Sequence, residues 1–446
     1  MYKPYSRPVT AASPDVKVAH PVISKLALFI LKIIAKPYIL LLFGPAKIVL
    51  HDEKILFDIF NEPPSGNNRT LIAFRHPDGR ESQLLAWFFI FKLRKLAAKK
   101  GIHFTKRPHV IFVYGYEVAR WGGKAARLVM PKIGAIPIHH SKLDSKGMAR
   151  IYDSIHNGPY PLALAPEGQV SYSTDTVPRL ETGVIRIGFQ AAQTNENCSV
   201  RLLPLSIHFR YGKRGRKAME KLLGKIEKTC GFFSKDTSPL SLEERLSRCR
   251  NKILEINEER YNIKNESLSF EERHKKVVDA ALVAAERMLG IKSEGDFFTR
   301  LYKVRHICWD RIYLPDVENF DGVSKAKRSL LDISAGEAWH IARHQELADF
   351  GWYFSHPLPK EDSALHVKVQ YVQNLFDYAS RTMGGAIADR KYIPSDKIII
   401  KPAPVIELSA RLCEYKKDRK RTIENTKNDL EKAYLDCIEQ VNKTEF

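Results

Sequence analysis

Residues 69–83, RTLIAFRHPDGRESQ, contain the pattern that decides the fold. Leu71 to Phe74 form an apolar run between Arg69-Thr70 and a Pro-Asp-Gly turn signal, which predicts a buried strand ending at His76. Glu81 follows at the start of a long helical pattern, ESQLLAWFFIFKLRKLAAKK, so one helical turn can bring its carboxylate back towards the imidazole. The segment therefore predicts a strand that delivers a histidine into a charged loop.

His76 and Glu81 are candidates for a catalytic pair. A carboxylate on one ring nitrogen of a histidine fixes the tautomer and raises the basicity of the other nitrogen, as general-base catalysis requires. A satisfied surface histidine shows the same spacing, and a single His-x4-Glu motif is a weak signal. The pair alone leaves both interpretations open.

Composition points to an anionic partner. The 446-residue chain is long enough for two or three domains, and its 72 Lys and Arg against 51 Asp and Glu give a formal net charge of +21. Such an excess predicts binding to a membrane surface, a nucleic acid or an acidic protein. The six cysteines show no CxxC or Cys/His spacing, so we expect neither a zinc site nor a disulfide framework, and a reducing cytoplasm fits best.

The N-terminal region combines a polar arm with an apolar segment. Residues 1–20 are polar with three prolines and predict a flexible arm. Residues 22–50, VISKLALFILKIIAKPYILLLFGPAKIVL, contain no acidic residue, and their apolar run is interrupted by Lys25, Lys32 and Lys36. These lysines fall within roughly 40° of one another on a helical wheel, which favours an amphipathic membrane-interface segment over residues 21–60. A buried amphipathic helix of a soluble core is the alternative.

Residues 69–210 alternate strand and helix signals. Such alternation predicts an α/β fold with a mainly parallel sheet and helices on both faces. The expected strands are 71–75, 109–116, 134–140, 161–166 and 200–209, and the expected helices are 81–100, 118–130, 145–157 and 181–194. Ligands of such sheets bind beyond the carboxyl ends of the strands, where His76 and a Pro-Glu-Gly turn at 166–168 are placed.

The C-terminal half has a different character. Residues 211–228 form a basic stretch that fits either anionic headgroups or a solvated helix face. From residue 240 onward, helical periodicity with short breaks predicts an α-helical bundle, followed by a short strand in 397–408 and a charged helix over about 409–442. We therefore expect an α/β domain over 61–215 and an α-helical C-terminal domain over 216–446.

Several blocks between residues 69 and 210 resemble the glycerolipid acyltransferase superfamily, which includes glycerol-3-phosphate and 1-acylglycerol-3-phosphate acyltransferases. The blocks are His76-x4-Glu81, GAIPIHH at 134–140, APEGQVS at 165–171, ETGVIRIG at 181–188 and LLPLSI at 202–207. Their order is more specific than any one block. The preceding apolar segment lies where this family often keeps its membrane anchor.

The resemblance implies roles for individual residues. His76 matches the catalytic base that takes a proton from an acceptor hydroxyl as it attacks an acyl thioester, and Glu81 matches its acidic partner, usually Asp. Glu167 and Gly168 match the block that shapes the acceptor site, and Pro204 matches the proline of the last block. We find no GxSxG elbow or activated Cys, which agrees with direct transfer.

Two departures concern phosphate binding. The family's arginine positions hold His140 in the second block and Val170 in the third. Arginine binds phosphate through a bidentate fork, which His matches only in part and Val not at all. The acceptor therefore lacks a glycerol-3-phosphate head, or another cation meets its phosphate. The candidate cations are Arg75, Arg80, Arg179 and Lys142.

The resemblance predicts a membrane-associated O-acyltransferase that moves a fatty acyl group from acyl-CoA or acyl carrier protein to a glycerol phosphate, lysophospholipid or related lipid acceptor. The predicted site comprises catalytic His76 and Glu81 and substrate-binding Glu167, Gly168, His140, Arg80 and Pro204, with no metal and no cofactor beyond the acyl donor. We expect an anionic membrane surface as partner, no nucleic acid, and a peripheral or monotopic location at the cytoplasmic face. The alternative is a non-catalytic basic membrane- or nucleic-acid-binding protein that retains the fold.

Overall fold

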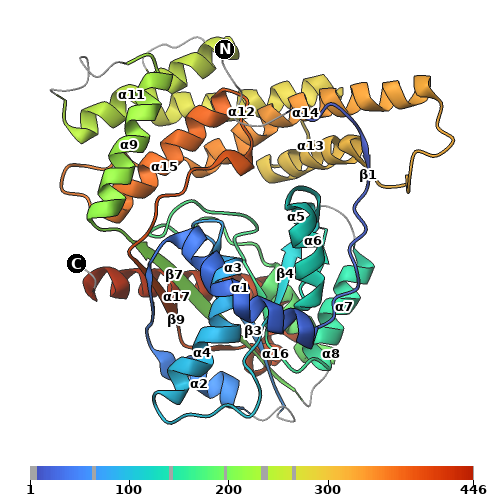
Figure 1. The fold of residues 1–446 in the computed structure, drawn as a ribbon, viewed down its shortest axis with the longest axis vertical. Coiled ribbons are helices and arrows are strands. Elements are labelled where there is room, and N and C mark those ends of the chain that lie inside the picture. The colour runs from blue at the N-terminus through green and yellow to red at the C-terminus, as the bar shows by residue number, and fades with distance from the viewer. Residues whose placement is uncertain are drawn as a thin grey trace. The chain divides into compact units, whose positions relative to one another are not determined.

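The computed structural model describes residues 8–62, 67–139, 144–194, 198–232, 240–263 and 268–444. The chain divides into two compact units (Figure 1). The α/β unit comprises Val18–Arg210 and Pro394–Phe446, and the helical unit comprises Met1–Lys17 and Tyr211–Ile393.

The α/β unit is built on an eight-stranded, mostly parallel sheet. Its order is β2-β9-β7-β3-β6-β4-β5, with β10 also pairing with β7. The strands are β2 (Lys47–Leu50), β3 (Asn68–Phe74), β4 (Ile111–Gly115), β5 (Ile136–Ile138), β6 (Leu162–Leu164), β7 (Ser199–Arg210), β9 (Lys397–Pro402) and β10 (Ile406–Glu407). β9 and β10 run antiparallel to β7, whereas the other pairs are parallel. The predicted α/β class and mainly parallel sheet are confirmed.

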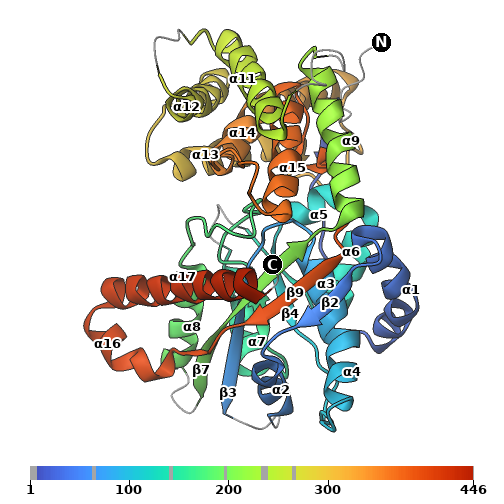
Figure 2. The same cartoon turned by 90° about the vertical axis from the view of Figure 1, so that its left-hand side faces the viewer.

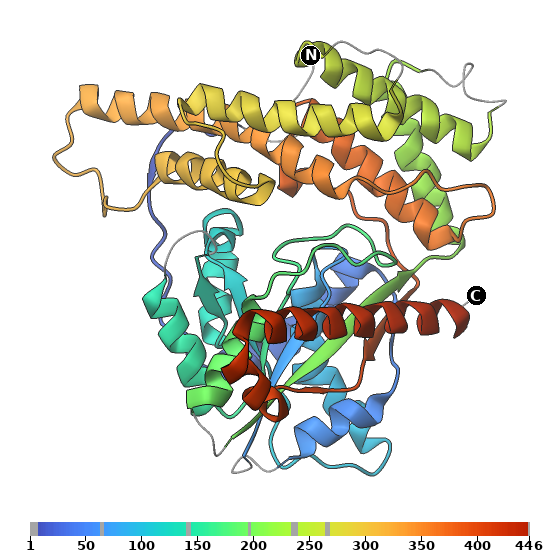
Figure 3. The same ribbon diagram turned by 180° about the vertical axis from the view of Figure 1, so that it is seen from behind.

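Helices cover both faces of this sheet. They are α1 (Lys25–Phe43), α2 (Glu53–Asn61), α3 (Glu81–Trp87), the π-helical segment η1 (Phe88–Lys92), α4 (Leu93–Ala98), α5 (Glu117–Trp121), α6 (Gly123–Lys132), α7 (Ser145–His156), α8 (Gly183–Thr194), the 3-10 turn η3 (Ser409–Arg411), α16 (Leu412–Lys417) and α17 (Arg419–Thr444). Figure 2 shows α8 and α17 on one side of the strands and α1, α3 and α4 on the other. In Figure 3, which views the molecule from the opposite side to Figure 1, α17 (red) crosses in front of the strands.

β3 lies in the interior of the sheet, between β6 and β7. Successive side chains of a strand point to opposite faces. Leu71 and Ala73 accordingly pack into one core with residues of α7, α8 and α17, while the ring of Phe74 contacts that of Phe112 at a centroid distance of 6.0 Å. A strand buried on both faces reads as a continuous apolar run, which explains the LIAF pattern.

The C-terminal part of the predicted helical domain belongs to the α/β unit instead. The helical unit ends at Ile393, and β9 pairs in parallel with β2 in the register Lys47↔Lys397. Ile398, Ile399 and Ile400 are fully buried in the sheet. The predicted boundary near residue 215 is close to the observed division at Tyr211, but a domain reaching residue 446 is wrong, because burying β9 requires partners from the other end of the chain.

The helical unit contains the expected bundle. Its helices are α9 (Lys213–Thr229), α11 (Leu242–Arg260), α12 (Phe270–Leu289), α13 (Phe297–Ile312), α14 (Lys325–Tyr353) and α15 (Leu365–Thr382), with a 3-10 turn η2 (Ile387–Asp389). Ser241 and Ser269 each form a capping box with a glutamate three positions later, which fixes the starts of α11 and α12.

The N-terminal arm is ordered over residues 8–17. β1 (Ser13–Pro14) pairs with β8 (Tyr313–Leu314), Ala12 is buried, and the Ala12 amide donates to Asp332 Oδ1 at 2.8 Å. The predicted flexible arm is therefore wrong for this stretch, because its main chain is tied to the helical unit, while residues 1–7 lie outside the described residues.

α1 is partly exposed although it is apolar. Among the described residues it is the one helix long and apolar enough to cross a membrane. Its buried side chains are Leu28, Ala35, Ile39 and Phe43. Its exposed large apolar side chains are Leu26, Phe29, Ile30, Ile33, Ile34, Tyr38, Leu40 and Leu41. α1 thus buries one face in the α/β unit, while much of its apolar surface faces outward.

Candidate active site

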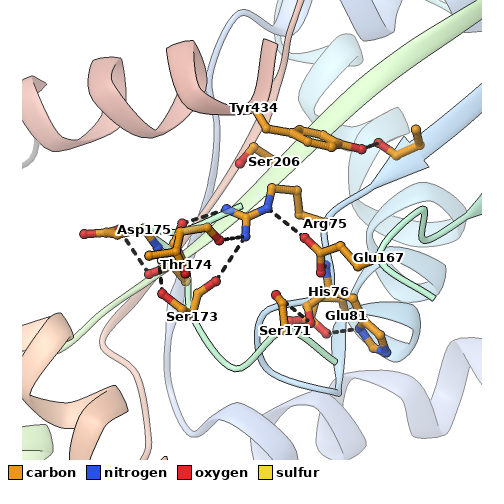
Figure 4. A network of polar contacts seen from close by, with 12 residues as sticks. Arg75, His76, Glu81, Glu167, Ser171, Ser173, Thr174, Asp175, Ser206 and Tyr434 are labelled. Atoms are coloured by element: carbon orange, nitrogen blue, oxygen red, sulfur yellow. Dashed lines mark hydrogen bonds and ion pairs between the residues drawn. The ribbon is translucent and has the colours of Figure 1, made fainter. Parts of the chain in front are cut away.

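His76 and Glu81 form a close pair at the carboxyl end of β3. His76 follows the strand in the loop before α3, and Glu81 is the first residue of α3. Glu81 Oε2 lies 2.6 Å from His76 Nδ1, so Nδ1–H donates to the carboxylate and Nε2 is left to accept a proton. The Glu81 side chain is fully buried, whereas 19% of the His76 side chain is exposed. Figure 4 shows the imidazole and the carboxylate facing each other.

The loop between them holds the Glu81 carboxylate in place. Its oxygens accept the amide of Asp78 at 2.5 Å and that of Gly79 at 2.8 Å. Gly79 has φ 107°, a conformation that favours glycine and that directs both amides to one carboxylate. Glu81 also lies in the first turn of α3, where the helix dipole favours an anion. The Pro-Asp-Gly residues thus form the turn whose amides orient the Glu81 carboxylate.

This surrounding raises the pKa of His76. Burial alone lowers it, but the charge and hydrogen bond of Glu81, with the charges of Glu167 and Asp78, outweigh burial and raise the pKa above its ordinary value of 6.5. The pair is therefore arranged as a base whose protonated form is stabilised.

Glu167 and Arg75 form a buried support behind His76. Glu167 Oε2 accepts the His76 amide at 2.8 Å, and Oε1 accepts Arg75 Nε–H at 2.9 Å. The two η nitrogens of Arg75 donate to the main-chain oxygens of Ser173 (3.1 Å), Thr174 (2.7 Å) and Thr176 (2.6 Å). Both charged side chains are fully buried. Figure 4 shows Arg75 between Glu167 and the 173–175 segment. Arg75 thus ties the 173–176 segment to β3, and its predicted availability to a substrate phosphate is wrong.

The Pro-Glu-Gly turn packs against the main chain of His76. Gly168 has φ 73°, and its amide donates to Ala165 O at 3.3 Å, so the chain reverses directly after Glu167. Farther along, the Ser171 amide donates to His76 O at 2.9 Å. The turn and its following segment therefore hold both the amide and the carbonyl of His76.

Arg80 binds protein groups rather than solvent. Its Nε and Nη2 donate to the two carboxylate oxygens of Asp78 at 2.6 and 3.0 Å. Nη1 donates to the main-chain oxygen of Leu42, and Cζ lies 4.5 Å from the ring centroid of Phe43. Arg80 and Asp78 are both buried. The arginine therefore connects the loop after β3 to the end of α1, a contact that its sequence position does not predict.

The remaining predicted residues differ in position. Pro204 is buried in β7, opposite Ala73 of β3. It lies between the part of β7 that pairs with β9 and the part that pairs with β10, and its carbonyl accepts the Ala403 amide at 3.0 Å. A proline is tolerated there because the partner strand is interrupted at that point. His140 and Lys142 lie outside the described residues. Arg179 is 44% exposed and lies 3.7 Å from Glu181, whose amide donates to Pro166 O.

Sequence reasoning missed the contribution of the C-terminal helix. Tyr434 of α17 is fully buried, its hydroxyl donates to Ala73 O at 2.9 Å, and its ring lies 5.9 Å from Arg75 Cζ. Burial raises the pKa of the Tyr434 hydroxyl well above its ordinary value. The helical periodicity of α17 places Tyr434 on the buried face, but it does not indicate that β3 is the contact partner.

Comparison with known proteins provides no independent assignment. No model of a known protein family matches this chain, and no curated protein matches its sequence. Within the described ranges, no group of three or more His, Cys, Asp or Glu side chains is arranged to hold a metal ion. The geometry around His76 is therefore the main indication of what the site can do.

Proposed function

We propose that this protein is a membrane-associated O-acyltransferase that moves a fatty acyl group from acyl-CoA or acyl carrier protein to a hydroxyl of a lipid or lipid precursor. The observation that carries the proposal is the 2.6 Å contact between His76 Nδ1 and a fully buried Glu81 at the carboxyl end of a parallel strand. This is the region where such sheets bind ligands.

The chemistry follows from the pair. His76 Nε2 takes the proton of the acceptor hydroxyl while the hydroxyl oxygen forms a bond to the thioester carbonyl carbon. Glu81 stabilises the imidazolium that results, because its carboxylate is already fixed by the amides of Asp78 and Gly79. The carbon–sulfur bond then breaks, and His76 returns the proton to the departing thiolate. The products are an ester and a free thiol, with no acyl-enzyme.

α1 supports the membrane part of the proposal. Single exposed apolar residues are ordinary, but a contiguous apolar helix face of this length marks an interaction surface. Lys25, Lys32 and Lys36 are exposed on the same helix. Lysines beside anionic lipid contribute about 1 kcal/mol each, so a helix lying in the interface with its lysines at the headgroups accounts for both features. The resulting location is the cytoplasmic face of a membrane, bound from one side.

The decisive experiment supplies the purified full-length protein with acyl-CoA, or acylated carrier protein, and lipid acceptors in anionic vesicles. We expect ester formation and thiol release by the wild type. His76→Ala should lower the rate by about 10²- to 10⁴-fold, the usual contribution of a general base. His103→Ala is the matched control, because His103 is an exposed histidine of the same unit. Activity of His76→Ala within a few fold of the wild type would contradict the assignment.

A further inference from the structure

Arg80 lies at an unfavourable end of its own helix. It occupies the N-cap position of α3, where the helix dipole disfavours a cation. Its guanidinium instead reaches the C-terminal end of α1, donating to Leu42 O and stacking over Phe43. α1 has no basic residue in its own last turn, so Arg80 supplies the cation that this helix end favours.

The same guanidinium holds the catalytic loop. Two of its nitrogens bind both carboxylate oxygens of Asp78, a bidentate arrangement that fixes orientation as well as distance. The Asp78 amide in turn donates to Glu81 Oε1 at 2.5 Å, and Glu81 Oε2 contacts His76. A continuous set of short contacts thus runs from the end of α1 to the imidazole.

The end of α1 is itself fixed to the sheet. Phe43 is fully buried, and its ring stacks on that of Phe209 in β7 at a centroid distance of 6.1 Å and an interplanar angle of 15°. The part of α1 before this point carries the exposed apolar side chains. One helix therefore joins an apolar outer face to a buried end that touches Arg80.

We infer that Arg80 is a positioning residue through which the seating of α1 in a bilayer orders the His76–Glu81 pair, so that acyl transfer is stimulated by the membrane that α1 binds. The inference rests on the proposed function and deepens it. Because a misplacement of about 1 Å can lower a rate by about 10²-fold, a small shift of Asp78 is sufficient to weaken catalysis.

Arg80→Lys is the sharpest test, since lysine keeps the charge but loses the fork and the planar stacking surface. Arg94→Lys is the matched control, because Arg94 is an exposed arginine of α4. We expect Arg80→Lys to lower kcat by about 10- to 100-fold with the KM for acyl-CoA within about twofold of the wild type. It should also lose the stimulation by anionic vesicles over detergent-dispersed acceptor, while still cosedimenting with the vesicles.

Phe43→Leu provides a second variant that leaves Arg80 and its charge intact. It removes the ring under the guanidinium but keeps an apolar side chain at the end of α1. If both residues act through one contact, the double variant Arg80→Lys with Phe43→Leu should be about as slow as Arg80→Lys alone. Thermal unfolding of each variant identifies any loss of activity that follows from loss of the fold.

The outcomes separate the inference from the function on which it rests. Transfer by the wild type together with unchanged kcat and unchanged vesicle stimulation in folded Arg80→Lys would overturn the positioning role. Independent, additive effects of the two substitutions would overturn it as well. Absence of transfer by the wild type with every donor and acceptor would overturn the proposed function itself, and the inference with it.

Discussion

The hydroxyl of Tyr434 donates a 2.9 Å hydrogen bond to the main-chain oxygen of Ala73, on the strand that ends at His76. The two residues come from opposite ends of the chain, and both are buried. α17 thereby supports the strand that carries the candidate base, and the C-terminal segment is part of the site's scaffold. The stability of the site should depend on this contact.

Tyr434→Phe should lower the free energy of unfolding of the α/β unit by about 1 kcal/mol, the usual net value of a buried hydrogen bond. Tyr434→Ala should cost about 3–5 kcal/mol, because it also leaves a cavity. Urea denaturation with amide exchange of β3 measures both changes. Tyr38→Phe is the control, since Tyr38 is an exposed tyrosine of the same unit. Equal effects of Tyr434→Phe and Tyr38→Phe would show that the contact contributes nothing.

The pH dependence of transfer should report the His76–Glu81 pair. His76 must be neutral to accept a proton, and its pKa is raised, so kcat/KM should rise with pH through an acid limb above 6.5. Glu81→Gln removes the charge that raises this pKa and leaves the lowering effect of burial. The acid limb of this variant should therefore move to lower pH while the plateau rate falls. If the acid limb of Glu81→Gln stays at the pH of the wild-type limb, a group other than His76 is responsible for it.

Glu167 should matter for stability as much as for activity. Glu167→Gln removes the charge opposite fully buried Arg75, and leaving a buried charge unpaired costs about 3–5 kcal/mol. Adding Arg75→Met should recover part of that stability, because the unpaired charge is then gone, but not the transfer rate. Glu181→Gln is the control, since its ion pair is 40% exposed on the glutamate side. Chemical denaturation of the wild type and of these three variants distinguishes a structural carboxylate from one that only contacts substrate.

The exposed face of α1 should determine membrane binding. Ile33→Ser with Leu41→Ser removes two side chains that are 65% and 82% exposed, so the fold should be unchanged while cosedimentation with anionic vesicles falls. Replacing Lys25, Lys32 and Lys36 with Glu should release the protein in a salt-dependent manner. Leu330→Ser with Ile333→Ser, exposed apolar residues of α14, is the matched control. Protease-protected fragments on both sides of the bilayer would instead show that α1 spans it.

Local patterns predicted the strands and helices around the site well. The LIAF run, the Pro-Asp-Gly turn and the spacing of His76 and Glu81 each depend on neighbouring residues, and the structure brings that pair to 2.6 Å. The long-range pairings could not be predicted in this way. β9 pairs with β2, and Tyr434 contacts Ala73, because these contacts bury apolar surface from distant parts of the chain. No pattern of neighbouring residues specifies either partner.

The role of arginines shows the same division. Arg75 and Arg80 were placed near the site by their sequence positions, but which group each one contacts follows from tertiary packing. Arg75 is held by Glu167 and three carbonyls, and Arg80 is held by Asp78 and the end of α1. A charged residue next to a catalytic motif therefore predicts proximity, while its partner is decided by the fold.

The contacts of Arg75 and Arg80 narrow the range of acceptors that we expect. With both arginines engaged by protein groups, the acceptor should lack a phosphate monoester, since a buried phosphate without partners costs several kcal/mol. Turnover on glycerol-3-phosphate should be at least about tenfold below that on phosphate-free or zwitterionic lipid acceptors, and Val170→Arg with His140→Arg should raise it. Side-by-side kcat/KM values for these acceptors and lysophosphatidic acid provide the measurement. Efficient use of glycerol-3-phosphate by the wild type, abolished by Arg179→Ala, would show that the half-exposed arginine near the Pro-Glu-Gly turn supplies the phosphate site. The expectation of an acceptor without a phosphate monoester would then be wrong.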